Sequence, residues 1–97
     1  MFVTFLSFAK NRAAAPDFMA AHNEWIARGF ADGVFHCVGT LQPEAGGAIL
    51  AHGESRAAHD ARIAADPFVV QGIVTAQTHE INARRTAPAL DFLKAPA

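Results

Sequence analysis

The chain has 97 residues, a hydrophobic share of 52% and a net charge of −1. That length suits a single domain over residues 1–97, because two cores would each be too small to offset chain entropy. The basic residues are spread along the chain, which excludes a stripe that neutralises several phosphates, so we expect no nucleic-acid partner. No stretch reaches the length of a membrane span, and the lone cysteine, Cys37, allows no internal disulfide. We expect a cytoplasmic protein with no membrane partner.

The pattern along the first half of the chain predicts a strand, a helix and a strand hairpin. Residues 2–8 are rich in aromatic and β-branched side chains, which favours a strand. Apolar residues recur at helical spacing over 17–30. Two short apolar runs, 34–41 and 48–53, flank a loop over 42–47 that contains two glycines. This length and composition are typical of an antiparallel hairpin.

The second half predicts a helix, a separate turn and a last strand. Alanines form one stripe of a helix over 56–65, so we expect this stripe to lie against the sheet and Ile63 to fall off it. The helix ends before Pro67, residues 68–71 form one turn, and the last strand lies within 73–83. This order predicts an α+β, ferredoxin-like βαββαβ fold, with a four-stranded antiparallel sheet and two helices on one face.

Apolar residues on both sides of the first strand predict a homodimer. Phe2 and Leu6 point to one face of the sheet, and Val3 and Phe5 point to the other. Two helices cover only one face, and the second face would be too apolar for a monomer. We therefore expect two identical sheets to pair face to face. The C-terminal arm, 84–97, carries apolar anchors that would brace the pair.

His22 is the first candidate for chemistry. It lies in the middle of the apolar stripe of the first helix, near Trp25, so its imidazole should face inward. Asp66, just before Pro67, is the natural carboxylate partner. Two other interpretations stay open: His22 is a core histidine bonded to the backbone, and Asp66 is the N-cap of the turn that follows. The cap and the partner role can coexist.

The other histidines and the cysteine indicate no second site. His36 and Cys37 are adjacent in a strand, so their side chains should point to opposite faces, and we expect Cys37 to pack in the core. His59 lies off the alanine stripe, so we expect it to be exposed or half-exposed, and His79 likewise. No two histidines have the spacing of H-E-x-x-H, so we expect no metal site, and no cofactor is evident.

Several residues together resemble the YCII-related domain family over most of the chain. They are His22 with Trp25-Ile26, Gly33, Gly39 after the second strand, Gly46-Gly47-Ala48-Ile49, Asp66-Pro67-Phe68 and Gly72. The resemblance implies the dimeric α/β-barrel group, whose members pair two ferredoxin-like sheets face to face. It also implies an active-site couple of a histidine and an aspartate, here His22 and Asp66. Many relatives have Gly-Pro where this chain has Gly39-Thr40, in a loop that shapes the family's pocket, so Gly39 and Thr40 are expected at the substrate.

These observations lead to two hypotheses about function. In the first, the chain is a cofactor-independent enzyme of lyase or isomerase type, in which His22, oriented by Asp66, acts as general acid or base. Its substrate is a small cyclic or aromatic metabolite held against Trp25 and Phe68. In the second, the domain only binds a small ligand or serves an assembly, and the histidine and the aspartate satisfy each other.

Overall fold

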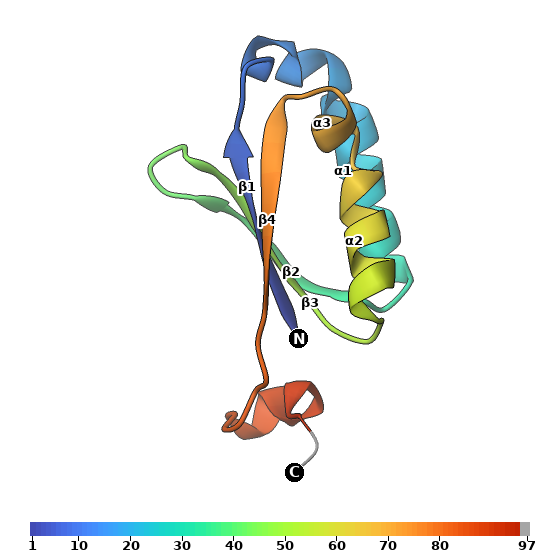
Figure 1. Ribbon diagram of the computed structural model, residues 1–97, viewed down its shortest axis with the longest axis vertical. Coiled ribbons are helices and arrows are strands. Elements are labelled where there is room, and N and C mark those ends of the chain that lie inside the picture. The colour runs from blue at the N-terminus through green and yellow to red at the C-terminus, as the bar shows by residue number, and fades with distance from the viewer. Residues whose placement is uncertain (96–97) are drawn as a thin grey trace.

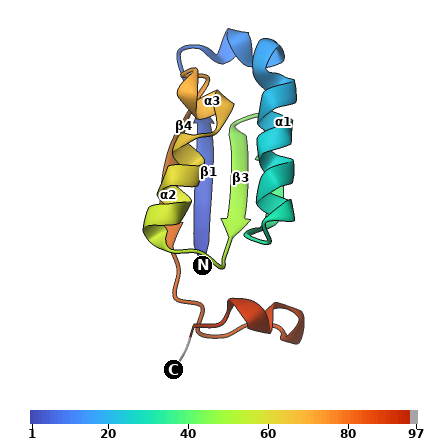
Figure 2. The same cartoon turned by 90° about the vertical axis from the view of Figure 1, so that its right-hand side faces the viewer.

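Four strands form one antiparallel sheet in the order β2-β3-β1-β4 in the computed structural model, which describes residues 1–95 (Figure 1). The elements in chain order are β1 (Phe2–Phe8), η1 (Arg12–Ala14), α1 (Ala15–Ala31), β2 (Phe35–Leu41), β3 (Gly46–Ala51), α2 (Arg56–Ala64), α3 (Pro67–Val70), β4 (Val74–Glu80) and η2 (Pro88–Leu93). Helices α1, α2 and α3 lie on one side of the sheet, which confirms the predicted α+β, ferredoxin-like fold (Figure 2). No helix within residues 1–95 is both long and apolar enough to span a membrane.

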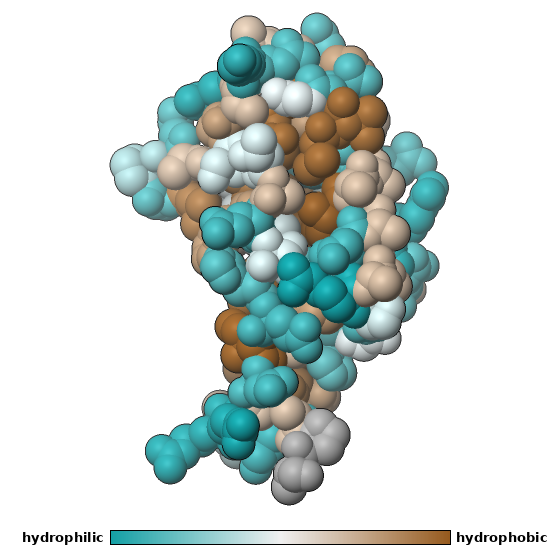
Figure 3. All heavy atoms as spheres, viewed as in Figure 1, coloured by the Kyte–Doolittle hydropathy of each residue, from teal (hydrophilic) through white to brown (hydrophobic). Residues whose placement is uncertain are grey.

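The core lies between the sheet and the helices. Phe2 and Leu6 of β1 are buried there, and apolar side chains are visible along the seam between the two layers (Figure 3). Helix α1 approaches β2 closely at Gly29, because a Cβ at that position would overlap the ring of Phe35. This close approach sets the position of α1 over the sheet, and with it the position of His22 two turns earlier.

Helix α2 turns a different face to the sheet from the one we predicted. Its buried residues are His59 and Ile63, which are four positions apart, and the alanines of the predicted stripe are exposed. The expectation of an exposed His59 was therefore wrong, as was the place given to Ile63. Burying an isoleucine and a ring removes far more apolar surface from water than burying alanines does. The helix begins where Ser55 Oγ accepts a hydrogen bond from the Ala58 backbone N–H, at 3.1 Å.

A β-bulge in β2 decides which of its side chains face the helices. Phe35 pairs with Ala51, but Cys37 already pairs with Leu50, so β2 carries one extra residue at this point. The alternation of faces therefore shifts beyond the bulge. Cys37 is exposed, and its predicted place in the core was wrong, because that prediction assumed unbroken alternation. Val38 packs against the core instead.

The far face of the sheet carries no helix in the described part of the chain. The strand register places Val3 and Phe5 of β1 on this face, beside Leu50 and Ala48 of β3. All four side chains are only partly buried. The apolar character that we expected on both sides of β1 is thus present, and this face is open in a single copy of the chain.

The C-terminal arm lies beyond one end of the sheet rather than over its face (Figures 1 and 2). A parallel bridge joins Ala83 to Lys94, and Leu93 is buried at 4% exposure. Leu90 and Phe92 are 44% and 49% exposed. The arm therefore has one buried anchor and two exposed apolar side chains. The arm was predicted to extend to residue 97, and its last two positions, 96 and 97, lie outside the residues that the structure describes.

Candidate functional site

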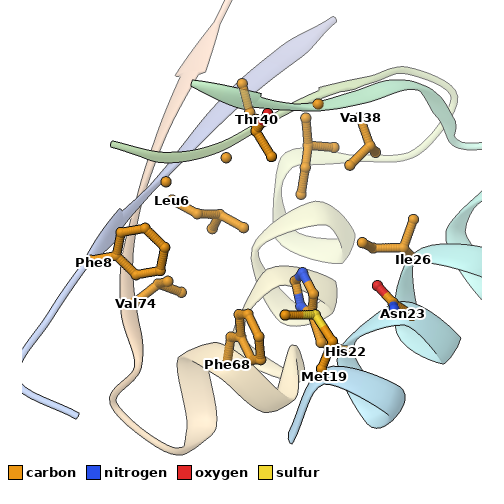
Figure 4. Close-up of a pocket in the computed structure, with 15 residues that line it drawn as sticks. Leu6, Phe8, Met19, His22, Asn23, Ile26, Val38, Thr40, Phe68 and Val74 are labelled. Atoms are coloured by element: carbon orange, nitrogen blue, oxygen red, sulfur yellow. The ribbon is translucent and has the colours of Figure 1, made fainter. Parts of the chain in front are cut away.

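A cavity of about 350 Å³ opens between α1, α3 and the helix-facing side of the sheet (Figure 4). This volume is in the range of small-molecule sites. Most of its lining is apolar and comes from strands and helices far apart in the sequence: Leu6, Phe8, Met19, Ile26, Val38, Ile49, Phe68 and Val74. The polar side chains at the cavity are His22, Asn23 and Thr40. A ligand here would contact apolar side chains over most of its surface and make a few polar contacts.

His22 and Asp66 meet at the wall of this cavity. His22 Nδ1 lies 2.7 Å from Asp66 Oδ1, although 44 residues separate them in the sequence. Asp66 is 0% exposed and is the N-cap of α3, where its Oδ1 also accepts a hydrogen bond from the Phe68 backbone N–H at 3.0 Å. The cap and the histidine partner, two interpretations that the sequence left open, are both present in one carboxylate. The catalytic role that we expect of this pair stays a prediction.

Aromatic rings hold the imidazole of His22 in one plane. The Phe68 ring is stacked on it with centroids 3.9 Å apart and an interplanar angle of 4°. Trp25 stacks less closely, at 5.9 Å and 23°. Stacking at these distances restricts rotation of the ring and adds to the hydrogen bond in fixing its direction. The side chain of His22 is 12% exposed, so it is enclosed but not sealed.

Trp25 lies behind His22 and is not among the residues that line the cavity, where we expected it. Its indole Nε1 donates a hydrogen bond to the Arg62 carbonyl oxygen at 3.0 Å, which ties α1 to α2. Arg62 also binds Glu54 and Asp32, each at 2.9 Å, and these contacts raise its pKa. Trp25 thus holds α1, which carries His22, against α2, which ends two residues before Asp66. Phe68, Gly39 and Thr40, the other expected pocket residues, do line the cavity.

The hydrogen bond between the pair assigns the tautomer of His22. An ionised carboxylate only accepts hydrogen bonds, so Nδ1 must carry the proton in the neutral ring. Nε2 is then an acceptor, and it is the ring nitrogen left for a ligand in the cavity. Asp66 Oδ2 is buried and has no hydrogen-bond partner among residues 1–95. The two hydrogen bonds that Asp66 accepts, from His22 and from the Phe68 backbone N–H, therefore both fall on Oδ1.

The strand hairpin supplies the opposite wall of the cavity. Gly46 and Gly47 form part of this wall with backbone alone, and a Cβ at Gly46 would collide with the Leu6 carbonyl oxygen. Thr40 reaches the cavity because of the bulge in β2, which places it opposite Gly47. Sequence reasoning missed Asn23 and Met19, which also line the cavity. The helical spacing of Met19 to His22 was a usable signal, whereas Asn23 lies off the apolar stripe and gave none.

Side chains that could bind a metal ion do not converge in the described part of the chain. Within residues 1–95, no group of three or more histidine, cysteine, aspartate or glutamate side chains is arranged to hold a metal ion.

Comparison with known proteins gives a fold but no family. No family model matches the chain, and no curated protein matches its sequence. Among solved structures, it is similar to 5-chloro-2-hydroxyhydroquinone dehydrochlorinase from Burkholderia phenoliruptrix AC1100, in complex with 2,5-dihydroxybenzoquinone. The TM-score is 0.68 and the identity 14%, over 86% of this chain and 95% of the other. A likeness at this identity shows a shared fold and leaves the chemistry to be argued from the site.

Proposed function

We propose that the chain is a cofactor-independent enzyme of lyase or isomerase type, related to the YCII-related family, that acts on a small cyclic or aromatic metabolite. His22 is the general acid or base, and Asp66 orients it. The observation that carries this proposal is the 2.7 Å hydrogen bond between His22 Nδ1 and Asp66 Oδ1 at the wall of an apolar cavity. A histidine held by a carboxylate beside a ligand-sized cavity is suited to general acid–base catalysis.

In the proposed chemistry, the same nitrogen atom, His22 Nε2, first accepts a proton and then donates it. Nε2 of His22 accepts a proton from an acidic hydroxyl or carbon of the ligand, and the Asp66 carboxylate stabilises the imidazolium that forms. Nε2 then returns this proton to another ring atom in an isomerisation, or to the leaving group in an elimination. Both reactions balance without an oxidant or reductant. The apolar walls exclude water and strengthen the interaction between the imidazolium and the carboxylate.

The similar solved structure supports a ring-shaped ligand. That protein is a dehydrochlorinase, and its structure holds a dihydroxybenzoquinone. Loss of hydrogen chloride is an elimination, which is one of the two reaction types that a single base can serve. The argument for this chain still rests on its own His22 and Asp66, because the two sequences share only 14% of their residues.

A binding module without catalysis is the second candidate. The observation in its favour is the low exposure of His22, whose side chain is 12% exposed and whose ring is covered by Phe68. In this case the pair would only satisfy two buried polar groups. A ligand that binds in the cavity and is never converted, together with unchanged binding in His22→Gln, would favour this candidate.

The test of the proposed function is a comparison of two histidine variants. We expect His22→Gln to lower kcat about 10²–10⁴-fold on any ring substrate that the protein converts, because it removes the base. The matched control is His52→Gln, since His52 packs near Phe92 at the other end of the sheet. Full activity in His22→Gln, or an equal loss in both variants, would refute the catalytic role.

We also propose that residues 1–97, with the arm over 84–97, work as a homodimer that pairs the far faces of two sheets. Val3 and Phe5 lie on this open face. Sedimentation at micromolar concentration should give twice the mass of one chain, and Val3→Lys should give a single chain because it buries a charge in the interface. Ala27→Lys, on exposed α1, should remain dimeric. A wild-type monomer would contradict the pairing.

A further inference from the structure

The electrostatic character of the cavity disfavours ligands with a carboxylate. Among the described residues that line it, there is no lysine or arginine. Arg12 lies over the Phe8 ring, 4.0 Å from its centroid, but is not itself part of the lining. The charge next to the site is the buried Asp66 carboxylate. An anionic ligand would lose its water without gaining a cation in return, which is costly.

At the α1 side of the cavity, the pair determines which hydrogen bond a ligand can make. Asp66 holds the Nδ1 proton of His22, so Nε2 presents a lone pair. The ligand group at this end must therefore be a donor. An acidic hydroxyl fits best, because it can donate the hydrogen bond and then transfer the proton.

At the β2 side, Thr40 offers a hydrogen-bond donor. Its side chain extends from the strand toward the cavity, across from His22, with the hydroxyl oxygen close to the strand (Figure 4). The Gln42 side-chain amide donates a hydrogen bond to Thr40 Oγ1, with Nε2 and Oγ1 3.3 Å apart. Thr40 Oγ1 thus already accepts one hydrogen bond, and its own proton is free to donate. An acceptor on the ligand at this end would match this proton.

The geometry points to one class of ligand: an uncharged ring with an acidic hydroxyl at one end and a hydrogen-bond acceptor at the opposite end, recognised by His22 and Thr40 respectively. This inference deepens the proposed function, since it relies on the same cavity and pair. It adds the charge and polarity of the ligand and makes Thr40 a specificity-determining residue. The cavity walls, which are apolar between the two ends, match the faces of such a ring.

The test compares two rings of similar size that differ in charge, 4-cyanophenol and 4-cyanobenzoate, by calorimetric titration at neutral pH. The phenol is then uncharged, the benzoate is ionised, and both carry a nitrile acceptor. We expect the phenol to bind at least about tenfold more tightly, which corresponds to about 1.4 kcal/mol. Equal or tighter binding of the benzoate would overturn the inference, and so would failure of the phenol to bind.

A second comparison isolates Thr40. We expect Thr40→Val to weaken 4-cyanophenol about tenfold, and to leave 4-methylphenol, which lacks the acceptor, within about twofold. Thr75→Val is the matched control, because Thr75 is an exposed threonine outside the cavity. Equal effects of Thr40→Val on the two phenols would contradict the role of Thr40.

These measurements separate the inference from the proposed function, because they record binding and not turnover. Tight, selective binding of the phenol without conversion of any ring substrate would refute the enzyme and leave the ligand class standing. Conversion of a ring carboxylate, lost in His22→Gln, would support the enzyme and overturn the ligand class.

Discussion

Two histidines face the sheet from neighbouring helices, and their surroundings differ in every respect that matters for chemistry. His22 on α1 bonds a carboxylate and lines a cavity. His59 on α2 is 0% exposed, and its Nε2 lies 2.8 Å from the Thr4 hydroxyl, which in turn lies 2.7 Å from the Thr78 hydroxyl. Its ring stacks on Phe2 at 4.7 Å. The first histidine is placed to exchange a proton with a ligand, and the second is placed to fill the core.

The comparison teaches that burial alone does not mark a functional histidine. Burial lowers the pKa of His59, and the carboxylates of Glu54 and Asp60 oppose this only in part. Its partner is the Thr4 hydroxyl, which does not stabilise an imidazolium as a carboxylate does. A carboxylate partner together with access to a ligand separates His22 from His59.

The largest effect should come from Asp66→Asn. Asparagine is also a good N-cap, so α3 should keep its start and the protein its fold. Because Asp66 Oδ1 accepts from both His22 Nδ1 and the Phe68 N–H, an asparagine oxygen at this place keeps both hydrogen bonds but carries no negative charge. The imidazolium that forms during turnover then lacks its carboxylate, and kcat should fall about 10²-fold or more. Steady-state kinetics with circular dichroism as the check on folding would measure this. Unchanged kcat would mean that His22, like His59, serves only the structure.

An effect of intermediate size should appear in the stability of His59→Ala. Removing a fully buried ring leaves a cavity and takes away one of the two hydrogen-bond partners of the Thr4 hydroxyl, so the free energy of unfolding should fall by about 2–4 kcal/mol. Ligand affinity of the folded protein should be unchanged. His22→Gln should show the reverse pattern, with weak destabilisation and lost activity. Denaturant unfolding of both variants tests this, and a stable His59→Ala protein would contradict it.

The smallest effect should be a pH dependence of stability that His59 causes. Its pKa lies below the ordinary 6.5 in the folded protein, so the unfolded chain binds the proton more readily. The free energy of unfolding should therefore fall as pH drops below about 6.5, until the folded-state pKa is passed. Arg56 and Arg62 add to this effect, and Glu54 and Asp60 oppose it. Unfolding curves of wild type and His59→Gln should differ in slope over this range, and identical slopes would contradict the assignment.

Local sequence patterns predicted where the helices and strands lie better than they predicted which side of each one is buried. The aromatic and β-branched run over 2–8 coincides with β1. Helix α2 was placed correctly, but its buried face was not, because a stripe of alanines carries little hydrophobic driving force compared with Ile63 and the His59 ring. The bulge after Phe35 left no signal in the sequence, since it depends on how β2 pairs with β3. Tertiary pairing decided both cases.

For the site too, local patterns predicted the individual residues but not their contact. The helical stripe placed His22 toward the interior, and the Asp-Pro pair placed Asp66 at the start of a turn. Their 2.7 Å contact requires α1 and α3 to lie side by side, which the periodicity of neither segment encodes. Asn23 was not predicted to line the cavity, because a polar residue off the apolar stripe is usually exposed to solvent. Trp25 was expected at the ligand, whereas its indole donates a hydrogen bond to the Arg62 carbonyl oxygen instead.

The most direct test of the central claim is nitrogen NMR of the His22 ring, free and with 4-cyanophenol. The arrangement at Asp66 predicts the tautomer with the proton on Nδ1, a lone pair on Nε2, and a shift confined to Nε2 when the phenol binds. The His59 signals should not change, because that ring lies outside the cavity. A His22 ring protonated on Nε2, or one that does not respond to the ligand, would contradict the claim that this pair presents a base to the cavity.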